Sequence, residues 1–287
     1  MRKKNAKTPR RQKEGKQNSS SRVLASSRLR DDSFDLARLR KSIKPFRLHY
    51  FTRLRSTNDH AAALRKHRRL FAPSIVLTSH QVAGRGRGSN TWWSGKGSLT
   101  VTFVLPVHEH RPPHHVPLIA GVALRNSLAT HSGIEDIQLK WPNDLLHRGR
   151  KLAGLLCERV DGVDLIGLGL NVNVDLKQVP KALREKVSSL RSISGVSFDM
   201  TALLIDLAKS LHQALSHRDE PPFAEVLREY DRHHALNGQR ISIDGVPGEP
   251  PLAGICVGLD RMGRLLVRNR SRVSHVIAGQ VILLNRQ

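Results

Sequence analysis

Short apolar runs alternate with longer stretches of helical spacing over residues 46–235. The runs rich in β-branched and aromatic residues predict strands over Phe46–Leu54, Ser74–Thr78, Ser98–Leu105, Gln138–Trp141, Arg150–Glu158 and Asp164–Val174. Apolar residues three and four positions apart predict helices over His60–Leu70, Leu118–His131, Asp199–Ser216 and Pro222–Ala235. This mixture predicts an α+β fold in which helices flank a mixed β-sheet.

The pattern changes at Leu236, where short strands separated by glycine-bearing turns replace the helices. The strands are predicted over Arg240–Ile243, Leu252–Leu259, Arg264–Arg268, His275–Ile277 and Val281–Leu284. Asp260-Arg261-Met262-Gly263 has the composition of a hairpin turn. We therefore predict a disordered basic arm over residues 1–45, an α+β domain over 46–235 and a small C-terminal β-barrel over 236–287.

The charge of the chain is strongly positive and unevenly distributed. Its 287 residues carry 48 Lys and Arg against 24 Asp and Glu, a formal net charge of +24. Residues 1–30 hold eleven of these cations against Glu14 alone, and a segment of this composition cannot build a core. Within the arm we expect no more than a helical turn around Phe34–Leu39. The arm has no interleaved aromatic residues and no helix-turn-helix pattern follows it. This favours a solubilising extension over specific contact with DNA.

Cysteine content and hydropathy indicate in which kind of cellular compartment the protein is expected. Cys157 and Cys256 lie in apolar runs and are typical of buried thiols, not of a disulfide framework. This predicts a reducing compartment, and we expect a cytoplasmic protein. No run of about 18 apolar residues occurs, so we expect no membrane span.

Residues 81–99 form a loop, between two predicted strands, that concentrates glycine, arginine and tryptophan. Glycine lets backbone N–H groups approach a ligand, and Arg85 and Arg87 present planar charged groups suited to carboxylate or phosphate. Trp92 or Trp93 offers an apolar surface on which a base can stack. No Gly-Lys-Ser/Thr closes the loop, so it is not a Walker motif. The composition favours an anion joined to a nucleotide, and the alternative is a loop that grips nucleic acid.

Three other stretches carry candidate chemistry. Ser56-Thr57-Asn58-Asp59 is a natural helix N-cap, which also leaves hydroxyl and N–H groups where a ligand can bind. Lys140 and Asp144 flank a turn at Trp141-Pro142, either as a structural ion pair or as substrate contacts.

The third stretch combines a lysine with a glycine-bearing strand. Lys151 lies at the mouth of an otherwise apolar strand, and Gly167 and Gly169 alternate on one face of the next strand. Glycines weaken a strand unless something approaches its backbone closely, and a flat ligand would do so.

Four histidines gather in HEHRPPHH, at positions 108, 110, 114 and 115. Imidazole clusters suggest a metal site, but two prolines interrupt this one and no helical spacing of histidine and carboxylate is present. We expect a solvated loop, and no metal site made from protein side chains alone.

The stretches GRGRGSNTWW, KWPNDLL, RKLAGLLCE and GLGLNVN occur together in the order and spacing of the biotin protein ligases. The chain resembles this family over about residues 46–284, including the C-terminal module. The resemblance implies a catalytic domain of the class II aminoacyl-tRNA-synthetase type followed by an SH3-like β-barrel. It implies the ligase-only type, without the N-terminal DNA-binding domain of some relatives.

The resemblance implies that ATP, as its Mg²⁺ complex, activates biotin to biotinyl-5′-AMP, from which biotin passes to a lysine of a carboxylase's biotin carboxyl carrier domain. It implies biotin contacts from Ser56, Thr57, Asn58, Gln81, Gly84, Arg85, Gly86, Arg87, Lys151, Gly167 and Gly169. It implies ATP or AMP contacts from Arg85, Arg87, Trp92, Lys140, Asn143, Lys151 and Asn171. It implies catalytic roles for Lys151, Arg87 and Asp144.

One departure and two alternatives accompany the resemblance. Many relatives carry Arg-x-Gly-Arg before the tryptophan, whereas this chain has Ser89 and Asn90 there, so we expect altered loop contacts. The nearest alternative is a lipoate or octanoate ligase or transferase of the same fold. The alternative from another class is a basic nucleic-acid-binding protein.

Overall fold

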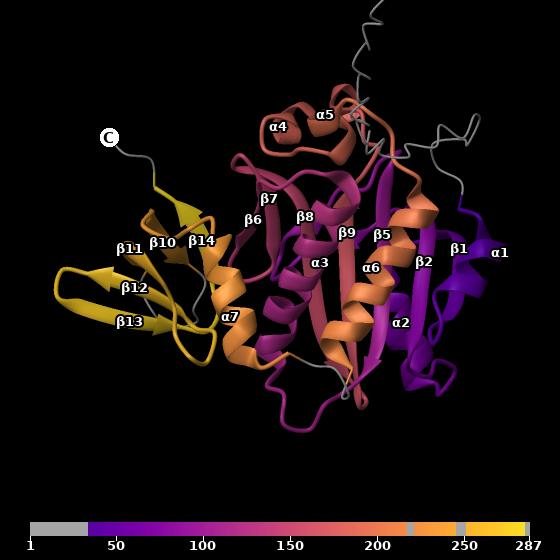
Figure 1. The fold of residues 1–287 in the computed structure, drawn as a ribbon, viewed down its shortest axis with the longest axis horizontal. Helices are drawn as coiled ribbons and strands as arrows, with labels where there is room; N and C mark the ends of the chain where they lie inside the picture. Colours follow the sequence, from indigo (N-terminus) through magenta and orange to yellow (C-terminus); the bar gives the residue numbers. More distant parts are fainter. Residues whose placement is uncertain (1–33, 217–220, 245–250, 285–287) are drawn as a thin grey trace, which may run out of the picture.

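The computed structural model describes residues 34–216, 221–244 and 251–284. A seven-stranded sheet forms its centre (Figure 1). In spatial order the strands are β1 (Arg47–Leu54), β2 (Ser74–Gln81), β5 (Ser98–Pro106), β9 (Val163–Asn171), β8 (Arg150–Val160), β7 (Asp144–His147) and β6 (Ile137–Lys140). β1 and β2 run parallel and the other neighbours run antiparallel, so the predicted mixed sheet is confirmed.

The central strands are apolar at successive positions because both faces of the sheet are covered. Alternate residues of a strand point to opposite faces. On β2, Ile75 and Leu77 join one apolar cluster and Val76 joins another. On β5, Phe103 belongs to the first cluster and Val104 to the second. This explains runs such as Ser74–Thr78, which show no polar alternation.

Helices cover the two faces (Figure 1). The helices are α1 (Leu36–Ser42), α2 (Thr57–Lys66), η1 (Pro113–His115), α3 (Val116–Ser132), η2 (Leu176–Gln178), α4 (Lys181–Arg184), α5 (Leu190–Ser194), α6 (Met200–Leu215) and α7 (Phe223–Arg232). α3 and α6 pack side by side against the face of the larger cluster, and α2 packs on the other. In the described part of the chain, no helix is long and apolar enough to cross a membrane.

The caps of these helices follow the sequence signals. Ser56 caps α2 by accepting from the backbone N–H of Asp59, and Asp199 caps α6 in the same manner. α3 ends at Gly133, whose φ of 72° is the left-handed conformation that glycine adopts without strain. The four main helices predicted for residues 46–235 are therefore confirmed, although α2 ends before the predicted Leu70.

The predicted arm over residues 1–45 is too long at its C-terminal end. Asp35 caps α1, and Leu39 and Ile43 are fully buried in the larger cluster. The helix forms because its apolar residues pack on the body, which composition does not reveal. Residues 1–33 lie outside the described residues.

The C-terminal residues form a separate five-stranded antiparallel sheet. Its order is β13 (Arg272–Val276), β12 (Leu265–Asn269), β11 (Leu252–Leu259), β10 (Arg240–Asp244) and β14 (Gln280–Leu283). The five predicted strands are confirmed. No pairing of β13 with β14 occurs among the described residues, so the barrel closure and SH3-like form stay predictions. Apolar residues of this sheet belong to the same cluster as the body, so the two parts share one core.

The two cysteines are free thiols, as predicted. Cys256 is completely buried and Cys157 is partly buried, and burial raises the pKa of both groups.

Candidate active site

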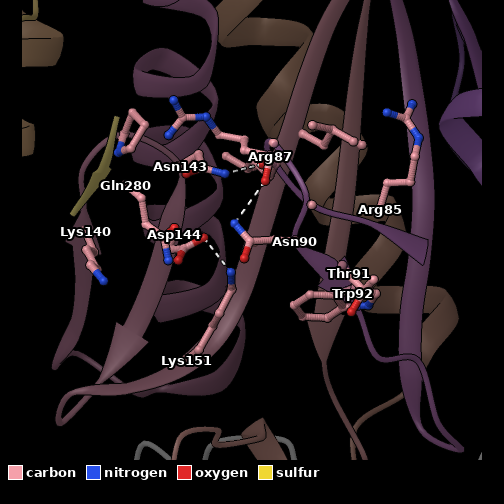
Figure 2. A pocket seen from close by; sticks show the side chains of 18 of the residues that line it. Arg85, Arg87, Asn90, Thr91, Trp92, Lys140, Asn143, Asp144, Lys151 and Gln280 are labelled. Carbon is pink, nitrogen blue, oxygen red and sulfur yellow. Dashed lines mark hydrogen bonds and ion pairs between the residues drawn. The ribbon is translucent and has the colours of Figure 1, made fainter. Parts of the chain in front are cut away.

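The loop after β2, the β6–β7 turn and the central strands surround one cavity of about 780 Å³. Figure 2 shows side chains from these separate segments facing it. The predicted site residues that line it are Ser56, Thr57, Asn58, Gln81, Arg85, Gly86, Arg87, Trp92, Lys140, Asn143, Asp144, Lys151, Gly167 and Gly169. The fold therefore brings together residues from four sequence motifs, and their roles toward a ligand stay predictions.

Gly84 and Asn171, also predicted as ligand contacts, are not among the residues that line the cavity. Asn171 is buried and donates to the carbonyl of Ser188, so it holds the chain after β9. Gly84 pairs with Trp92 between the short strands β3 (Gly84–Arg85) and β4 (Thr91–Trp92). A Cβ at Gly84 would lie 2.5 Å from Gln81 Nε2, so this glycine permits close packing of the loop. The predicted ligand contacts of Gly84 and Asn171 stay predictions.

The N-terminus of α2 and the end of β2 form one wall. The Gln81 side-chain oxygen accepts from the backbone N–H of Thr57 at 2.9 Å and from its hydroxyl at 3.3 Å. These bonds connect residues far apart in sequence and fix the glutamine amide where the glycine loop begins.

Asn58 is held by internal hydrogen bonds on both sides of its amide. Its oxygen accepts from Thr102 Oγ1 at 2.6 Å, and its nitrogen donates to the Leu156 carbonyl and to Glu158. A Cβ on Gly167 would approach the Asn58 oxygen to 2.3 Å. Gly167 therefore gives room to Asn58, a purpose that the sequence pattern does not indicate.

Arg85 binds protein carboxylates in this structure. Its guanidinium donates to Asp59 at 2.8 Å and to both Glu158 oxygens at 3.0 Å. Burial lowers its pKa, but these two carboxylates outweigh burial and raise it. Figure 2 shows Arg85 apart from Arg87, Asp144 and Lys151. The Nε and Nη2 atoms of Arg85 are therefore engaged by protein carboxylates.

Arg87 extends into the cavity from the glycine loop (Figure 2). Burial lowers the pKa of its guanidinium, and the nearby Asp144 carboxylate opposes this shift. Asn90, one of the two departures from the family pattern, donates from its side chain to the Arg87 carbonyl at 2.9 Å. Asn90 thus supplies a loop contact of its own, which orders the backbone that carries Arg87.

Lys151 and Asp144 form an ion pair across neighbouring strands. Lys151 Nζ lies 2.7 Å from Asp144 Oδ1 and 5.7 Å from the centre of a Trp92 ring. Lys140 is the cross-strand partner of Asp144 in the β6–β7 register, but the Asp144 carboxylate forms its ion pair with Lys151. Burial lowers the pKa of Lys140, with Asp144 opposing. Of the two alternatives for Lys140 and Asp144, this geometry favours a substrate contact for Lys140.

Glycines on β8 and β9 form the floor of the cavity. Gly154 and Gly169 are partners in the β8–β9 register. A Cβ at Gly169 would lie 2.3 Å from the Trp92 indole, and one at Gly154 would lie 3.0 Å from Lys151 Nζ. The indole of Trp92 therefore lies directly on the strand predicted to receive biotin. Trp92 lines the cavity and Trp93 packs over Gly95, so the stacking role stays a prediction for Trp92.

The β6–β7 turn carries Asn143 to the edge of the cavity. The Trp141-Pro142 peptide is cis, which produces the sharp turn predicted there. Asn143 is fixed by β8, because its side chain donates to the Leu155 carbonyl and its own carbonyl accepts from the Leu155 N–H at 2.8 Å.

Several lining residues carry no local signal in the sequence. Leu183, Lys186 and Val187 reach the cavity because the chain after α4 pairs with Lys151, whose N–H donates to the Lys186 carbonyl at 2.8 Å. The C-terminal sheet contributes its own set, Asp244, Ala278, Gly279, Gln280 and Val281. Only long-range packing brings these segments to the site.

The histidine-rich loop is more ordered than predicted. His114 and His115 bond to the Met262 carbonyl, and the His115 ring stacks on Phe223 with centroids 3.6 Å apart. The prediction of a solvated loop is therefore wrong at these two positions. In the described residues, no group of three or more His, Cys, Asp or Glu side chains forms a possible metal site.

Residues 50–175 match the model of the biotin/lipoate A/B protein ligase family. They contain the glycine loop, the β6–β7 turn, Lys151 and the glycine floor. Over this segment the chain is similar to that family, and the resemblance to biotin protein ligases found in its sequence is confirmed. Members similar to it include the biotin–[acetyl-CoA-carboxylase] ligase of Mycobacterium tuberculosis, 29% identical over 73% of this chain and 79% of the relative. The corresponding ligase of Paracoccus denitrificans is 28% identical over 79% of this chain and 97% of its own length.

Other biotin/lipoate ligase family members are longer or structurally known. The bifunctional ligase/repressor BirA of Bacillus subtilis is 27% identical over 73% of this chain, which spans 66% of that protein. The biotin protein ligase of Aquifex aeolicus, solved with biotin and ATP, superposes with a TM-score of 0.73 at 25% identity. That likeness covers 83% of this chain and 99% of the other. The predicted fold class is thereby confirmed.

Proposed function

We propose that this protein attaches biotin to a lysine of a biotin carboxyl carrier domain in two steps. In the first, a biotin carboxylate oxygen attacks the α-phosphorus of ATP, and pyrophosphate leaves with the electrons of the broken P–O bond. In the second, the carrier lysine amine attacks the acyl carbon of biotinyl-5′-AMP, AMP leaves, and the amine loses a proton to water. The names of the relatives and the shape of the cavity support this assignment.

The observation that carries the proposal is the charge of the cavity. Arg87, Lys140 and Lys151 face it, whereas its lining carboxylates among the described residues are Asp144 and Asp244. Preorganised cations stabilise the charge that gathers on a carboxylate and a phosphate as they approach, and each such donor commonly contributes about 3 kcal/mol. We assign Arg87 and Lys151 to the carboxylate and α-phosphate, and Lys140 and Asn143 to the nucleotide side.

The remaining walls suit the apolar and polar parts of biotin. The floor at Gly169 admits a flat ring system once Trp92 leaves it, beside Gly167, which gives room to Asn58. Ser56, Thr57 and Gln81 offer hydroxyl and amide groups at the α2 end. We propose that Trp92 then turns to cover the adenine, because an indole stacks on a base and excludes water from the reactive anhydride.

Asp144 is proposed to act through Lys151. The Asp144 carboxylate lies 2.7 Å from the Lys151 ammonium. In this position it orients the Lys151 side chain, and it is not free to accept a proton from the carrier amine. We therefore propose Asp144 as a positioning group and propose that the carrier amine loses its proton to solvent.

Exchange of labelled pyrophosphate into ATP tests the proposal. Purified protein is incubated with biotin, lipoate, octanoate or no acid. We expect exchange with biotin alone, and transfer to a carrier domain bearing the acceptor lysine but not to one with that lysine replaced by arginine. Exchange that ignores biotin overturns the proposal, and exchange with lipoate or octanoate instead supports the alternative within the family.

The nucleic-acid alternative makes a different prediction. Binding carried by phosphate contacts weakens steeply with salt and does not depend on biotin. Binding of duplex DNA at physiological salt by the full chain, without biotin-dependent exchange, would favour that alternative.

We propose that ATP reacts as its Mg²⁺ complex, with the ion held mainly by phosphate oxygens. Chelation with EDTA is expected to abolish exchange, and excess Mg²⁺ to restore it. Free thiols in the sequence lead us to propose a cytoplasmic location, which fractionation of cells would test.

A further inference from the structure

The tip of the β11–β12 hairpin, residues 260–263, packs into the body of the protein beside the cavity. Trp141 Nε1 donates to the Gly263 carbonyl at 3.1 Å, although the two residues are 122 positions apart. Asp260 shapes the tip by accepting from the backbone N–H groups of Met262 at 2.9 Å and Arg264 at 3.0 Å. The tip is thus a rigid turn whose carbonyls face the catalytic body.

Gly263 fits a space that no other residue can occupy without movement. Its φ is +76°, and an added Cβ would lie 2.6 Å from Leu118 Cδ1 and 3.1 Å from Phe223 Cζ. The tip therefore touches the starts of both α3 and α7. A side chain at this position therefore crowds Leu118 and strains the turn, because φ of +76° disfavours residues other than glycine.

Two histidines hold the neighbouring carbonyl. His114 Nε2 lies 3.0 Å and His115 Nε2 lies 3.1 Å from the Met262 oxygen. Because a carbonyl only accepts, both rings must carry a proton on Nε2. The Met262 side chain itself is 47% exposed, so only its backbone takes part in this contact.

The β6–β7 turn lies between this hairpin and β8. On one side Trp141, 3% exposed, is bonded to Gly263; on the other side Asn143 is bonded to Leu155. Trp141 also lines the cavity, and Lys140 and Asn143 project into it from the same turn. Pro142 has no N–H with which to add a backbone bond.

We propose that the 260–263 hairpin tip positions the nucleotide-facing turn, with Trp141 as the positioning residue and the histidine pair as the clamp that holds the tip. The inference rests on the proposed function for its kinetic consequence. Loss of the tip contact lets the turn move, so Lys140 and Asn143 lose their alignment with ATP. No hydrogen bond or ion pair among the described residues joins the tip to α2, Gln81 or Gly167, so the biotin side should keep its geometry.

Four variants test the proposal in biotin-dependent pyrophosphate exchange. Gly263→Ala strains the tip at φ of +76° and crowds Leu118. Trp141→Phe removes the indole N–H while keeping an aromatic ring. Met262→Ala changes only the exposed side chain of the tip. Gly162→Ala is the matched glycine control, because Gly162 also has φ of +76° but nothing within 4 Å of an added Cβ.

We expect Gly263→Ala and Trp141→Phe to raise KM for ATP about five- to tenfold, the effect of losing one buried hydrogen bond. KM for biotin should change less than twofold, and both control variants should match wild type. The single changes His114→Phe and His115→Phe each leave one donor on the Met262 carbonyl. The rise in KM for ATP in the double variant should therefore exceed the sum of the two single rises. Equal rises in both KM values, or no rise in KM for ATP, overturn the proposal.

Hydrogen exchange separates this inference from the proposed function. In Trp141→Phe and Gly263→Ala, backbone amides of residues 139–146 should exchange faster than in wild type and in Met262→Ala. Unchanged protection overturns the positioning role even if the enzyme is active. Absence of biotin-dependent exchange in wild type, with faster amide exchange in the two variants, would refute the proposed function and leave the structural coupling established.

Discussion

Replacement of Lys151 by methionine separates catalysis from stability. The Lys151 side chain is 35% exposed and that of Asp144 is 20% exposed, so their 2.7 Å ion pair remains largely screened. Such pairs contribute about 0–1 kcal/mol, and the ring contact with Trp92 adds about 0.5 kcal/mol. Methionine keeps the length and apolar stem over Gly154. We therefore expect a loss of about 1 kcal/mol in the free energy of unfolding.

The effect on adenylate formation should be much larger. A cation about 4 Å from a developing anion contributes about 4 kcal/mol at an effective dielectric constant of about 20. Mutation of single oxyanion donors gives about 3 to 4 kcal/mol, or about 10² to 10³ in rate. Both arguments predict that Lys151→Met lowers kcat/KM for biotin-dependent pyrophosphate exchange by at least a hundredfold. Unfolding in urea measures the stability of the same preparation.

Arg150→Met is the matched control for loss of a positive charge. Arg150 is adjacent on β8, 49% exposed, and bonded to Glu185 at 3.4 Å. It should lower exchange less than threefold. A loss of less than threefold in Lys151→Met as well would refute the role given to Lys151, and so would an activity loss explained wholly by unfolding.

A double-variant cycle tests how Asp144 acts. If Asp144 only positions Lys151, then Asp144→Asn alone lowers exchange about tenfold, and adding it to Lys151→Met has little further effect. A full additional loss in the double variant would show that Asp144 has a direct role, such as accepting a proton.

Three further changes test other parts of the structure. Gly169→Ala forces the Trp92 indole off β9. We expect greater acrylamide quenching of tryptophan fluorescence and about a fivefold higher KM for biotin. Wild-type values of both quantities would contradict the contact between Trp92 and Gly169. Burial lowers the pKa of His234 to about 4, so the free energy of unfolding falls as pH falls from about 6.5 to 4, where only the unfolded chain binds the proton. In urea unfolding, His234→Leu should show a flatter pH dependence over this range, and an unchanged slope would refute this effect. Despite burial, hydrogen bonds from His275 and Arg264 lower the pKa of Asp260 to about 2. Asp260→Asn should therefore be less stable than wild type at pH 7, and the difference should shrink as pH falls below about 4. A difference that stays constant with pH would argue against this role.

The elements of the body could be predicted well because their signals are local. β-branched runs, the Asp199 cap and the Gly133 terminus each act over a few residues, and the structure has strands and helices at those places. The arm boundary was wrong because α1 depends on packing: Leu39 and Ile43 are ordinary apolar residues until the body covers them.

Candidate site residues were predictable as a set but not in their contacts. The motifs supplied the types of residue, and the structure places most of them around one cavity. It did not follow from sequence that Arg85 binds Asp59 and Glu158, or that Asn171 holds Ser188. Each of these contacts joins segments separated by 17 to 73 residues, and no local pattern specifies which partner a side chain meets.

The sequence by itself determined the α+β class, the β-rich C-terminal module and the family, because periodicity, caps and motif spacing are properties of neighbouring residues. Tertiary structure alone decided that Lys151 binds Asp144, that Trp92 lies on Gly169, and that the C-terminal hairpin holds Trp141. These are contacts across the sheet or between the body and the C-terminal module. They depend on the register of distant strands and on the space left by glycine, which exist only once the chain has folded.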